Sequence, residues 1–178
     1  MIKHPWHEVR IGKKSPEIVN AIIEIPKGSR AKYEIDKDSG LIKLDRVLYG
    51  SMMYPTHYGI IPQTLFDDGD PLDILILTQV VVVPLTLVTA KVIGVMRMID
   101  QGVPDDKIIA VVSSDPSVSL MNDIGDLPQN LKDELKNFFE NYTRLEGKIV
   151  SIPAFLDKKA AFETIEHSIE LYNKKFSL

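Results

Sequence analysis

An acidic loop runs directly into an apolar segment in the stretch Asp67-Asp68-Gly69-Asp70-Pro71-Leu72-Asp73-Ile74-Leu75-Ile76-Leu77. Asp-Gly and Asp-Pro are ordinary turn-forming pairs, whereas four consecutive apolar residues, 74–77, are typical of a buried strand. Asp73 therefore stands where a strand enters the core, and a carboxylate in that place needs a cation or a metal ion as its partner. We expect a strand over 72–77 with the acidic loop at its start.

The apolar segment continues without a charge from Ile74 to Ala90, but it is too short for a membrane span and contains Pro84 and several polar residues. Its Val and Thr content predicts two buried strands with a break near Pro84. The N-terminus lacks the apolar region of a secretory signal, and the absence of cysteine is consistent with a reducing compartment. We therefore expect a cytoplasmic protein that does not bind a membrane.

Strand patterns occupy most of the first two-thirds of the chain. Besides 72–77, strands are predicted over 18–25, 32–36, 41–45, 87–98 and 107–112. The second and third of these flank the turn sequence Lys37-Asp38-Ser39-Gly40, which predicts a hairpin. A polar connection that contains Gly and Pro, 100–106, joins the last two strands.

Apolar residues at helical spacing predict two helices in the C-terminal third. The first is expected to start at an N-cap Asp126, to hold Pro128 in its first turn and to end at Gly147. The second is expected from about Asp157 to Asn173. Many short strands followed by two helices indicate an α+β fold, either a twisted sheet or a small barrel with the helices packed outside.

Length and charge limit the classes of function. With 178 residues, no repeat and no linker, the sequence predicts a single domain over 1–178. A formal net charge of −4 and the lack of a basic, aromatic strand face argue against nucleic-acid binding. An OB-like nucleic-acid-binding module is the alternative from a different class. A two-metal nuclease or nucleotide phosphohydrolase is the alternative among enzymes.

The acidic loop is a candidate metal site. It is not an EF-hand, because counting from Asp68 places Asp73 at position 6, where that motif needs Gly, and Gln79 at position 12. Oxygen ligands without cysteine favour Mg²⁺, Mn²⁺ or Ca²⁺ over Zn²⁺. The simpler interpretation of Asp67 is that it is a solvated turn residue, and we expect it to have no role in the site.

A second acidic group, formed by Asp100, Asp105 and Asp106 beside Lys107, lies at the end of another predicted strand. Singly, such residues are usually solvated loop charges. A sheet can nevertheless bring two strand ends together, and two converging carboxylate groups could hold several divalent ions. Such an arrangement suits phosphoryl transfer to water.

A polyanionic substrate also needs positive donors. Lys32 and Glu34 are two residues apart, so they share one face of a strand, where an exposed ion pair is the simpler explanation. Glu24 lies near the end of an apolar strand and is harder to explain as an exposed surface charge. Arg46 follows the hairpin, and Tyr54 opens a kinked aromatic segment in which a tyrosine could donate to phosphate or simply pack.

Several of these segments resemble one enzyme family. The loop Asp68-Gly69-Asp70-Pro71-Leu72-Asp73 matches the signature of the soluble family I inorganic pyrophosphatases of prokaryotic and archaeal type. The resemblance runs in order over 18–152 through Ile23–Pro26, Lys32–Asp36, Asp45-Arg46, Tyr54-Pro55, Tyr58-Gly59, Asp100–Lys107 and Phe138–Tyr142. It implies a five-stranded OB-like β-barrel with flanking helices, a homo-oligomer that is commonly a hexamer, and hydrolysis of pyrophosphate to two orthophosphates.

The resemblance also implies a role for each matching residue. Asp68, Asp73 and Asp105 would hold the tightest Mg²⁺, with Asp73 bridging to a second ion, Asp100 sharing a third with Asp105, and Glu24 supporting a further one. Asp70 would be the general base for direct attack by a metal-activated water or hydroxide. The phosphate oxygens would be bound by Lys32, Arg46, Lys107, Tyr58 and Tyr142, and the pocket would also be lined by Glu34 and Tyr54. Mn²⁺ or other divalent ions could replace Mg²⁺.

The chain departs from the family pattern at one position. The family usually has lysine directly after the tyrosine that Tyr142 matches, whereas this chain has Thr143 and then Arg144. One residue turns a helical side chain by about 100°, so Arg144 is not a simple replacement. Whether Arg144 or another cation serves the substrate is left open by the sequence.

Overall fold

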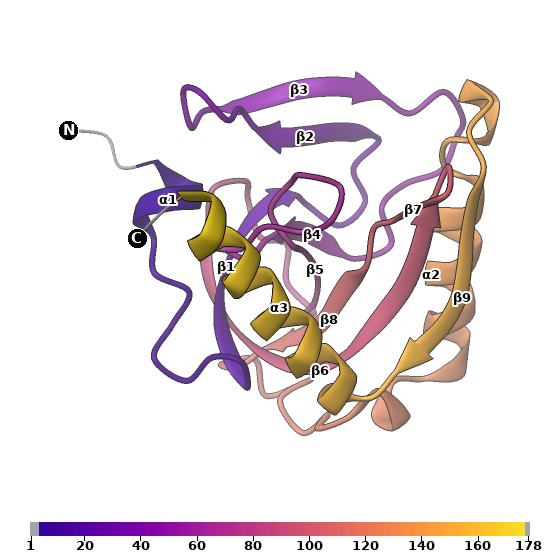
Figure 1. Cartoon of the computed structure of the whole chain (residues 1–178). Helices are drawn as coiled ribbons and strands as arrows, with labels where there is room; N and C mark the ends of the chain where they lie inside the picture. Colours follow the sequence, from indigo (N-terminus) through magenta and orange to yellow (C-terminus); the bar gives the residue numbers. More distant parts are fainter. Residues whose placement is uncertain (1–3, 177–178) are drawn as a thin grey trace.

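The centre of the fold is a closed barrel of five strands, seen in the computed structural model, which describes residues 4–176 (Figure 1). The ring follows the order β1 (Ile18–Ile25), β4 (His57–Ile60), β5 (Asp73–Leu77), β8 (Lys107–Val112) and β6 (Leu87–Asp100). It closes because β6 pairs with both β8 and β1. The prediction of an α+β fold built on a five-stranded OB-like barrel is confirmed.

The uninterrupted apolar run of β5 is explained by burial on both faces. Ile74 and Ile76 belong to one core cluster, whereas Leu75 and Leu77 belong to another on the opposite face. The neighbouring β8 shows the same division, and β5 and β8 pair in parallel. A strand covered on both sides has no polar face, so its sequence does not alternate.

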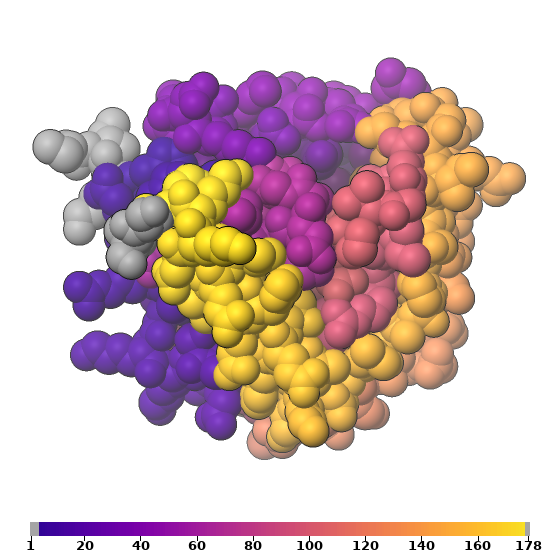
Figure 2. Space-filling model, viewed as in Figure 1, coloured from indigo at the N-terminus to yellow at the C-terminus, as the bar shows by residue number. Residues whose placement is uncertain are grey.

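Four further strands are attached to the barrel. A separate two-stranded sheet consists of β2 (Ala31–Ile35) and β3 (Ile42–Val47), and β7 (Val103–Pro104) and β9 (Val150–Leu156) both pair with β6. The β2–β3 hairpin was predicted, and it spans one end of the barrel at the top of Figures 1 and 2. The predicted connection 100–106 contains the short strand β7.

The helices cover the two core clusters. Residues of α2 (Gln129–Asn141) pack in one cluster with β9, and α3 (Lys158–Phe176) packs against the other face of the barrel and lies across the front of Figure 2. The remaining helical segments are α1 (Pro5–Glu8) and the 3₁₀ helices η1 (Ile124–Asp126) and η2 (Arg144–Glu146). Both predicted C-terminal helices are present. Within 4–176, no helix is both long and apolar enough to cross a bilayer.

The predicted boundaries of the first helix were wrong at both ends. Asp126 belongs to η1, where its carboxylate accepts from the backbone of Asn122, and Pro128 is the N-cap of α2 instead of a first-turn residue. The helix ends at Asn141, and Gly147, with φ of 77°, ends η2. Because 142–147 leave the helical path, Tyr142 and Glu146 do not lie on a common helix face.

Candidate active site

A cleft of about 410 Å³ opens between the β2–β3 hairpin, the barrel and the end of α2. Of the thirteen residues that the sequence nominated for a site, eleven line this cleft: Glu24, Lys32, Glu34, Tyr54, Tyr58, Asp68, Asp70, Asp73, Asp100, Asp105 and Tyr142. The other two do not line it: Lys107 is buried against the lining residues Asp73 and Asp105, and Arg46 pairs with Asp45 and Glu146. The barrel therefore brings both acidic groups to one place.

The acidic loop is a tight turn that places Asp68 and Asp70 in the lining of the cleft. The Phe66 N–H donates to the Asp70 carbonyl at 2.8 Å, and the Gly69 N–H donates to the Phe66 carbonyl at 2.9 Å. Gly69 adopts φ of 88°, a left-handed conformation that favours glycine. The Asp68 carboxylate accepts from the Asp70 N–H at 3.0 Å. Burial raises the pKa of Asp68, so its charged form needs a positive partner.

Lys107 connects the two acidic groups. It is opposite Asp73 in the parallel β5–β8 register, and its Nζ donates to Asp73 Oδ2 at 2.6 Å and also contacts Asp105. Burial alone lowers the pKa of Lys107, but Asp73 and Asp105 together raise it above its ordinary value, so the ammonium stays charged. Burial raises the pKa of Asp105 to about 7, with Lys107 opposing the shift and Asp73 adding to it.

The second acidic group divides between two roles. Asp105 and Asp100 line the cleft, and Asp100 Oδ1 is buried with no hydrogen-bond partner among residues 4–176. Asp106 does not line the cleft: it pairs with Arg97 and accepts from the Met98 N–H at 3.1 Å. Asp105 and Asp106 lie in the short link between β7 and β8, and their side chains have different partners: Lys107 for Asp105, and Arg97 with the Met98 N–H for Asp106.

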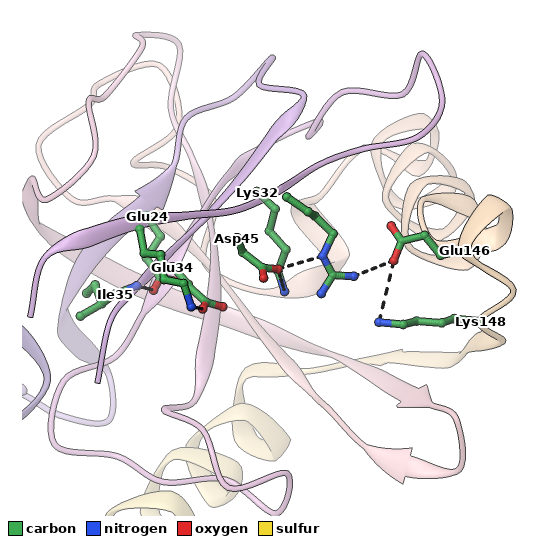
Figure 3. Close-up of polar contacts among 9 residues, drawn as sticks. Glu24, Lys32, Glu34, Ile35, Asp45, Glu146 and Lys148 are labelled. Carbon is green, nitrogen blue, oxygen red and sulfur yellow. Dashed lines mark hydrogen bonds and ion pairs between the residues drawn. The ribbon is translucent and has the colours of Figure 1, made fainter. Parts of the chain in front are cut away.

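Glu24 is a buried carboxylate at the base of the hairpin. Only 5% of the residue is exposed, and its Oε1 accepts from the Ile35 N–H at 2.7 Å, so β1 is tied to β2 (Figure 3). Burial, reinforced by the charge of Asp73, raises the pKa of Glu24 to about 8. Near neutral pH this carboxyl is therefore largely protonated unless a cation is nearby.

Three phenols form another wall. Tyr54 packs against Tyr58 with ring centroids 5.8 Å apart, and Tyr142 stacks on Phe138 at 5.2 Å. The Lys107 Nζ lies 5.6 Å from the centroid of the Tyr58 ring. Burial raises the pKa of Tyr58 and Tyr54, and raises that of Tyr142 to about 12. These hydroxyls therefore remain protonated at neutral pH and can donate hydrogen bonds.

A row of alternating charges connects the hairpin with the segment that follows α2 (Figure 3). It runs in the order Lys32, Asp45, Arg46, Glu146, Lys148. Asp45 Oδ2 is shared by the Lys32 Nζ at 3.3 Å and the Arg46 Nε at 2.8 Å. The sequence analysis did not nominate Asp45, Glu146 or Lys148. For Glu146, no signal in the sequence indicates a contact with a residue 100 positions away.

The structure answers the open question about Arg144 and adds a cation, Lys37, that the sequence did not nominate. Arg144 is exposed in η2 and does not line the cleft, and the preceding Thr143 is buried. Lys37, which was not nominated, lines the cleft at the hairpin tip and contacts Asp70. Glu34 pairs with the Lys43 Nζ at 3.4 Å on the more exposed side of the hairpin.

The donor chemistry of the cleft fits hard divalent cations. Carboxylates are prominent in its lining, and carboxylate oxygens are the ligands that such cations prefer. Asp100 Oδ1, which is buried without a partner in the described residues, is an oxygen available to bind a cation. In the described part of the chain, no three acidic or histidine side chains are gathered as a finished metal site. Lys107 contacts Asp73 and Asp105, and Lys37 contacts Asp70.

An OB-like barrel whose cleft combines buried carboxylates, an embedded lysine and protonated phenols defines a class of proteins built to handle phosphate together with divalent cations. Comparison with known sequences makes the class specific. The family model described as inorganic pyrophosphatase matches residues 21–173, so the chain belongs to the inorganic pyrophosphatase family.

Individual relatives agree with this assignment. The chain is 50% identical over 169 residues to "Soluble inorganic pyrophosphatase 4" of Arabidopsis thaliana, covering 95% of this chain and 78% of that protein. A maize soluble inorganic pyrophosphatase is also 50% identical, with 95% and 79% covered. Among solved structures, the inorganic pyrophosphatase of Thermus thermophilus superposes with a TM-score of 0.92 at 42% identity, covering 96% of this chain and 99% of that one.

Proposed function

We propose that this chain hydrolyses inorganic pyrophosphate to two orthophosphates by direct attack of water or hydroxide, without a phosphorylated enzyme. The observation that carries the proposal is the convergence of Asp68, Asp73, Asp100 and Asp105 on one cleft that also holds phenols and backs onto Lys107. Family membership and this acidic lining favour the reaction over nucleic-acid binding by the same kind of barrel.

The metal in the proposal is Mg²⁺, several ions per cleft, with Mn²⁺ or other divalent ions as substitutes. Asp68, Asp73 and Asp105 would hold the tightest ion, with Asp100 and Glu24 supporting others. When bound, these ions neutralise the pyrophosphate charge and lower the pKa of the attacking water. Glu24 and Asp105 must lose their protons to act as ligands, so metal binding by this chain is proton-coupled.

Asp70 is the proposed general base. It is held at the end of the acidic turn by the backbone bond to Phe66, and its carboxylate lines the cleft. Lys37 contacts this carboxylate from the hairpin tip. In this role the Asp70 carboxylate accepts the proton of the attacking water.

The remaining side chains bind and orient the substrate. Lys32, Arg46 and Lys107 supply positive charge to the phosphate oxygens, and Tyr58 and Tyr142 donate hydrogen bonds. Glu34 and Tyr54 complete the lining. Because Lys107 is 2% exposed and fixed by two carboxylates, its charge is already oriented before the substrate arrives.

We further propose that the protein works in the cytoplasm and assembles as a homo-oligomer, a hexamer by family resemblance. These expectations rest on the sequence and on the family. Size-exclusion chromatography with light scattering tests the assembly.

Isotopic labelling combined with mass measurement tests the mechanism. Hydrolysis in H₂¹⁸O is expected to place one solvent oxygen in the orthophosphate formed per turnover. Intact-mass spectra of samples quenched during a single turnover are expected to contain no phosphorylated protein. Absence of solvent label in the product, or accumulation of a phosphorylated chain, would contradict direct attack.

A further inference from the structure

The geometry points to Glu146 as a positioning residue for Arg46: we propose that its carboxylate, together with Asp45, fixes the guanidinium so that its free N–H groups meet phosphate. The inference rests on the proposed function, because it concerns the pyrophosphate cleft. It deepens that proposal by assigning a role to η2, a segment that neither the family resemblance nor the cleft lining brings into the site.

The first argument is the way in which Arg46 is held. Its Nε donates to Asp45 Oδ2 at 2.8 Å, and its Nη1 donates to Glu146 Oε2 at 2.6 Å. A guanidinium has five N–H donors in one plane, so two carboxylates on different nitrogens define the orientation of that plane. Three N–H donors are left over for a ligand.

The second argument is that Glu146 has little other reason to be buried. Its side chain is 10% exposed, and within 4–176 its Oε1 is buried without a hydrogen-bond partner. Leaving a buried carboxylate oxygen unsatisfied is unfavourable for folding. The contacts of its other oxygen are with Arg46 and, at 3.9 Å, with the Lys148 Nζ. Burial of Glu146 is therefore unfavourable for one of its oxygens, and the clearest result of that burial is that Arg46 is held in place.

The third argument is topological. Arg46 is the residue before the last one of β3, in a sheet separate from the barrel, and Glu146 lies in η2, between α2 and β9. The pair thus anchors the end of the hairpin that lies away from its turn to the segment that follows Tyr142. Since Asp45 also contacts the Lys32 Nζ, the same anchor orients two of the proposed phosphate-binding cations.

Steady-state kinetics at saturating Mg²⁺ provide the test, with Glu146→Gln as the central variant. Loss of the carboxylate charge is expected to raise KM for pyrophosphate about tenfold while kcat changes less than about twofold. In an Arg46→Ala background, Glu146→Gln is expected to add no further increase, because its effect passes through Arg46. An unchanged KM, or an equal increase in both backgrounds, would overturn the inference. A lower KM would do so too, since Glu146 would then compete with the substrate.

Two control variants separate positioning from other effects. Glu140→Gln weakens the same part of the fold, because Glu140 accepts from the Ile152 N–H at 3.0 Å, but it is expected to leave KM unchanged. Lys148→Gln removes a charge beside Glu146 without removing the anchor and is expected to change KM less than about twofold. A tenfold increase in KM with Glu140→Gln would mean that the effect of Glu146→Gln comes from fold stability. The same increase with Lys148→Gln would mean that it comes from the general charge of this region.

Calorimetric titration with orthophosphate and Mg²⁺ distinguishes failure of this inference from failure of the proposed function. If the parent protein binds phosphate, Glu146→Gln is expected to weaken binding about tenfold whether or not pyrophosphate is hydrolysed. An inactive parent with this weakened binding would remove the proposed function and leave Glu146 as a positioning residue. Equal binding by parent and variant, or no binding by either, would remove the inference.

Discussion

Asp73 and Lys107 face each other at the first position of the parallel pair β5–β8, with the Lys107 Nζ 2.6 Å from Asp73 Oδ2. This contact places a fixed positive charge between the two acidic groups, because the same ammonium also contacts Asp105. The two acidic groups are thus held together by a lysine to which the proposed mechanism gives a substrate-binding role.

Replacement of Lys107 by Met is the first prediction. The metal-free protein is expected to lose about 3 kcal/mol of unfolding free energy, because two carboxylates lose their buried cation. Mg²⁺ is expected to raise the melting temperature of Lys107→Met by more than that of the parent, since the ion replaces the missing charge. Thermal denaturation with EDTA and with Mg²⁺ measures both effects. Equal Mg²⁺ responses of parent and variant would contradict this account of the site.

The pH dependence of the metal-free protein is the second prediction. Folding raises the pKa of Glu24 from 4.5 to about 8 and that of Asp105 from 3.8 to about 7. A group whose pKa rises on folding binds more protons in the native state, so its contribution is fully present at low pH and is lost as the pH rises through the folded pKa. Stability in EDTA is therefore expected to fall between about pH 4.5 and pH 8.

Denaturation midpoints between pH 4.5 and pH 9 check this direction, and Glu24→Gln serves as the matched variant. The amide keeps the shape of the side chain but cannot ionise, so the decline is expected to be shallower. With saturating Mg²⁺ the decline is expected to disappear, because the ion binds the deprotonated groups. Stability that rises over this interval in EDTA would contradict the burial of these carboxyls.

Asp105 and Asp106 supply a third prediction, because adjacent residues are assigned opposite roles. Asp106→Asn is expected to reduce stability by about 2 kcal/mol through its contacts with Arg97 and the Met98 N–H, with KM unchanged. Asp105→Asn is expected to reduce activity and Mg²⁺ affinity strongly while stability in EDTA stays equal or increases, since a buried charge is removed. Kinetics and urea denaturation of both variants provide the comparison. The reverse pattern would assign the metal-binding role to Asp106.

Close approach of β1 and β4 leads to a fourth prediction. A Cβ on Gly59 would lie 2.1 Å from the Ile22 carbonyl oxygen, whereas a Cβ on Gly125 would have nothing within 4 Å. Gly59→Ala is therefore expected to destabilise the barrel by about 3 kcal/mol, because backbone must move, and Gly125→Ala is expected to have little effect. Urea denaturation of the two variants measures the difference. Similar midpoints would contradict the β1–β4 register.

Local sequence predicted those parts of the fold that carry strong patterns. The run 74–77 indicated a buried strand, and the turn Lys37–Gly40 indicated the hairpin, because apolar burial and turn chemistry are properties of adjacent residues. The strand β4 was missed because Pro55 precedes it and Gly59 lies within it, so that its sequence looked like a kinked segment. The strand β9 was missed because Pro153 interrupts its pattern, although proline is tolerated where a strand lies at an edge.

The sequence could predict those site residues that belong to recognisable motifs, but not the contacts between residues that are far apart in the chain. Family resemblance nominated the residues of the cleft and gave no role to Asp106, whereas the residues alone had grouped Asp106 with Asp100 and Asp105. Nor could it place Lys37 against Asp70 or Glu146 against Arg46, since these contacts join residues that are 33 and 100 positions apart. Such pairs depend on how the barrel closes and how the hairpin folds over it, which is information that no local window contains.

Release of orthophosphate from pyrophosphate, measured across a Mg²⁺ titration for the parent and for Asp70→Asn, tests the central claim most directly. The account predicts no release without metal, release that rises to saturation with Mg²⁺, and a turnover lower by about 100-fold in the variant, whose amide cannot accept the proton. Equal turnover in Asp70→Asn would remove Asp70 as the base. No Mg²⁺-dependent release from the parent would contradict the proposed function itself.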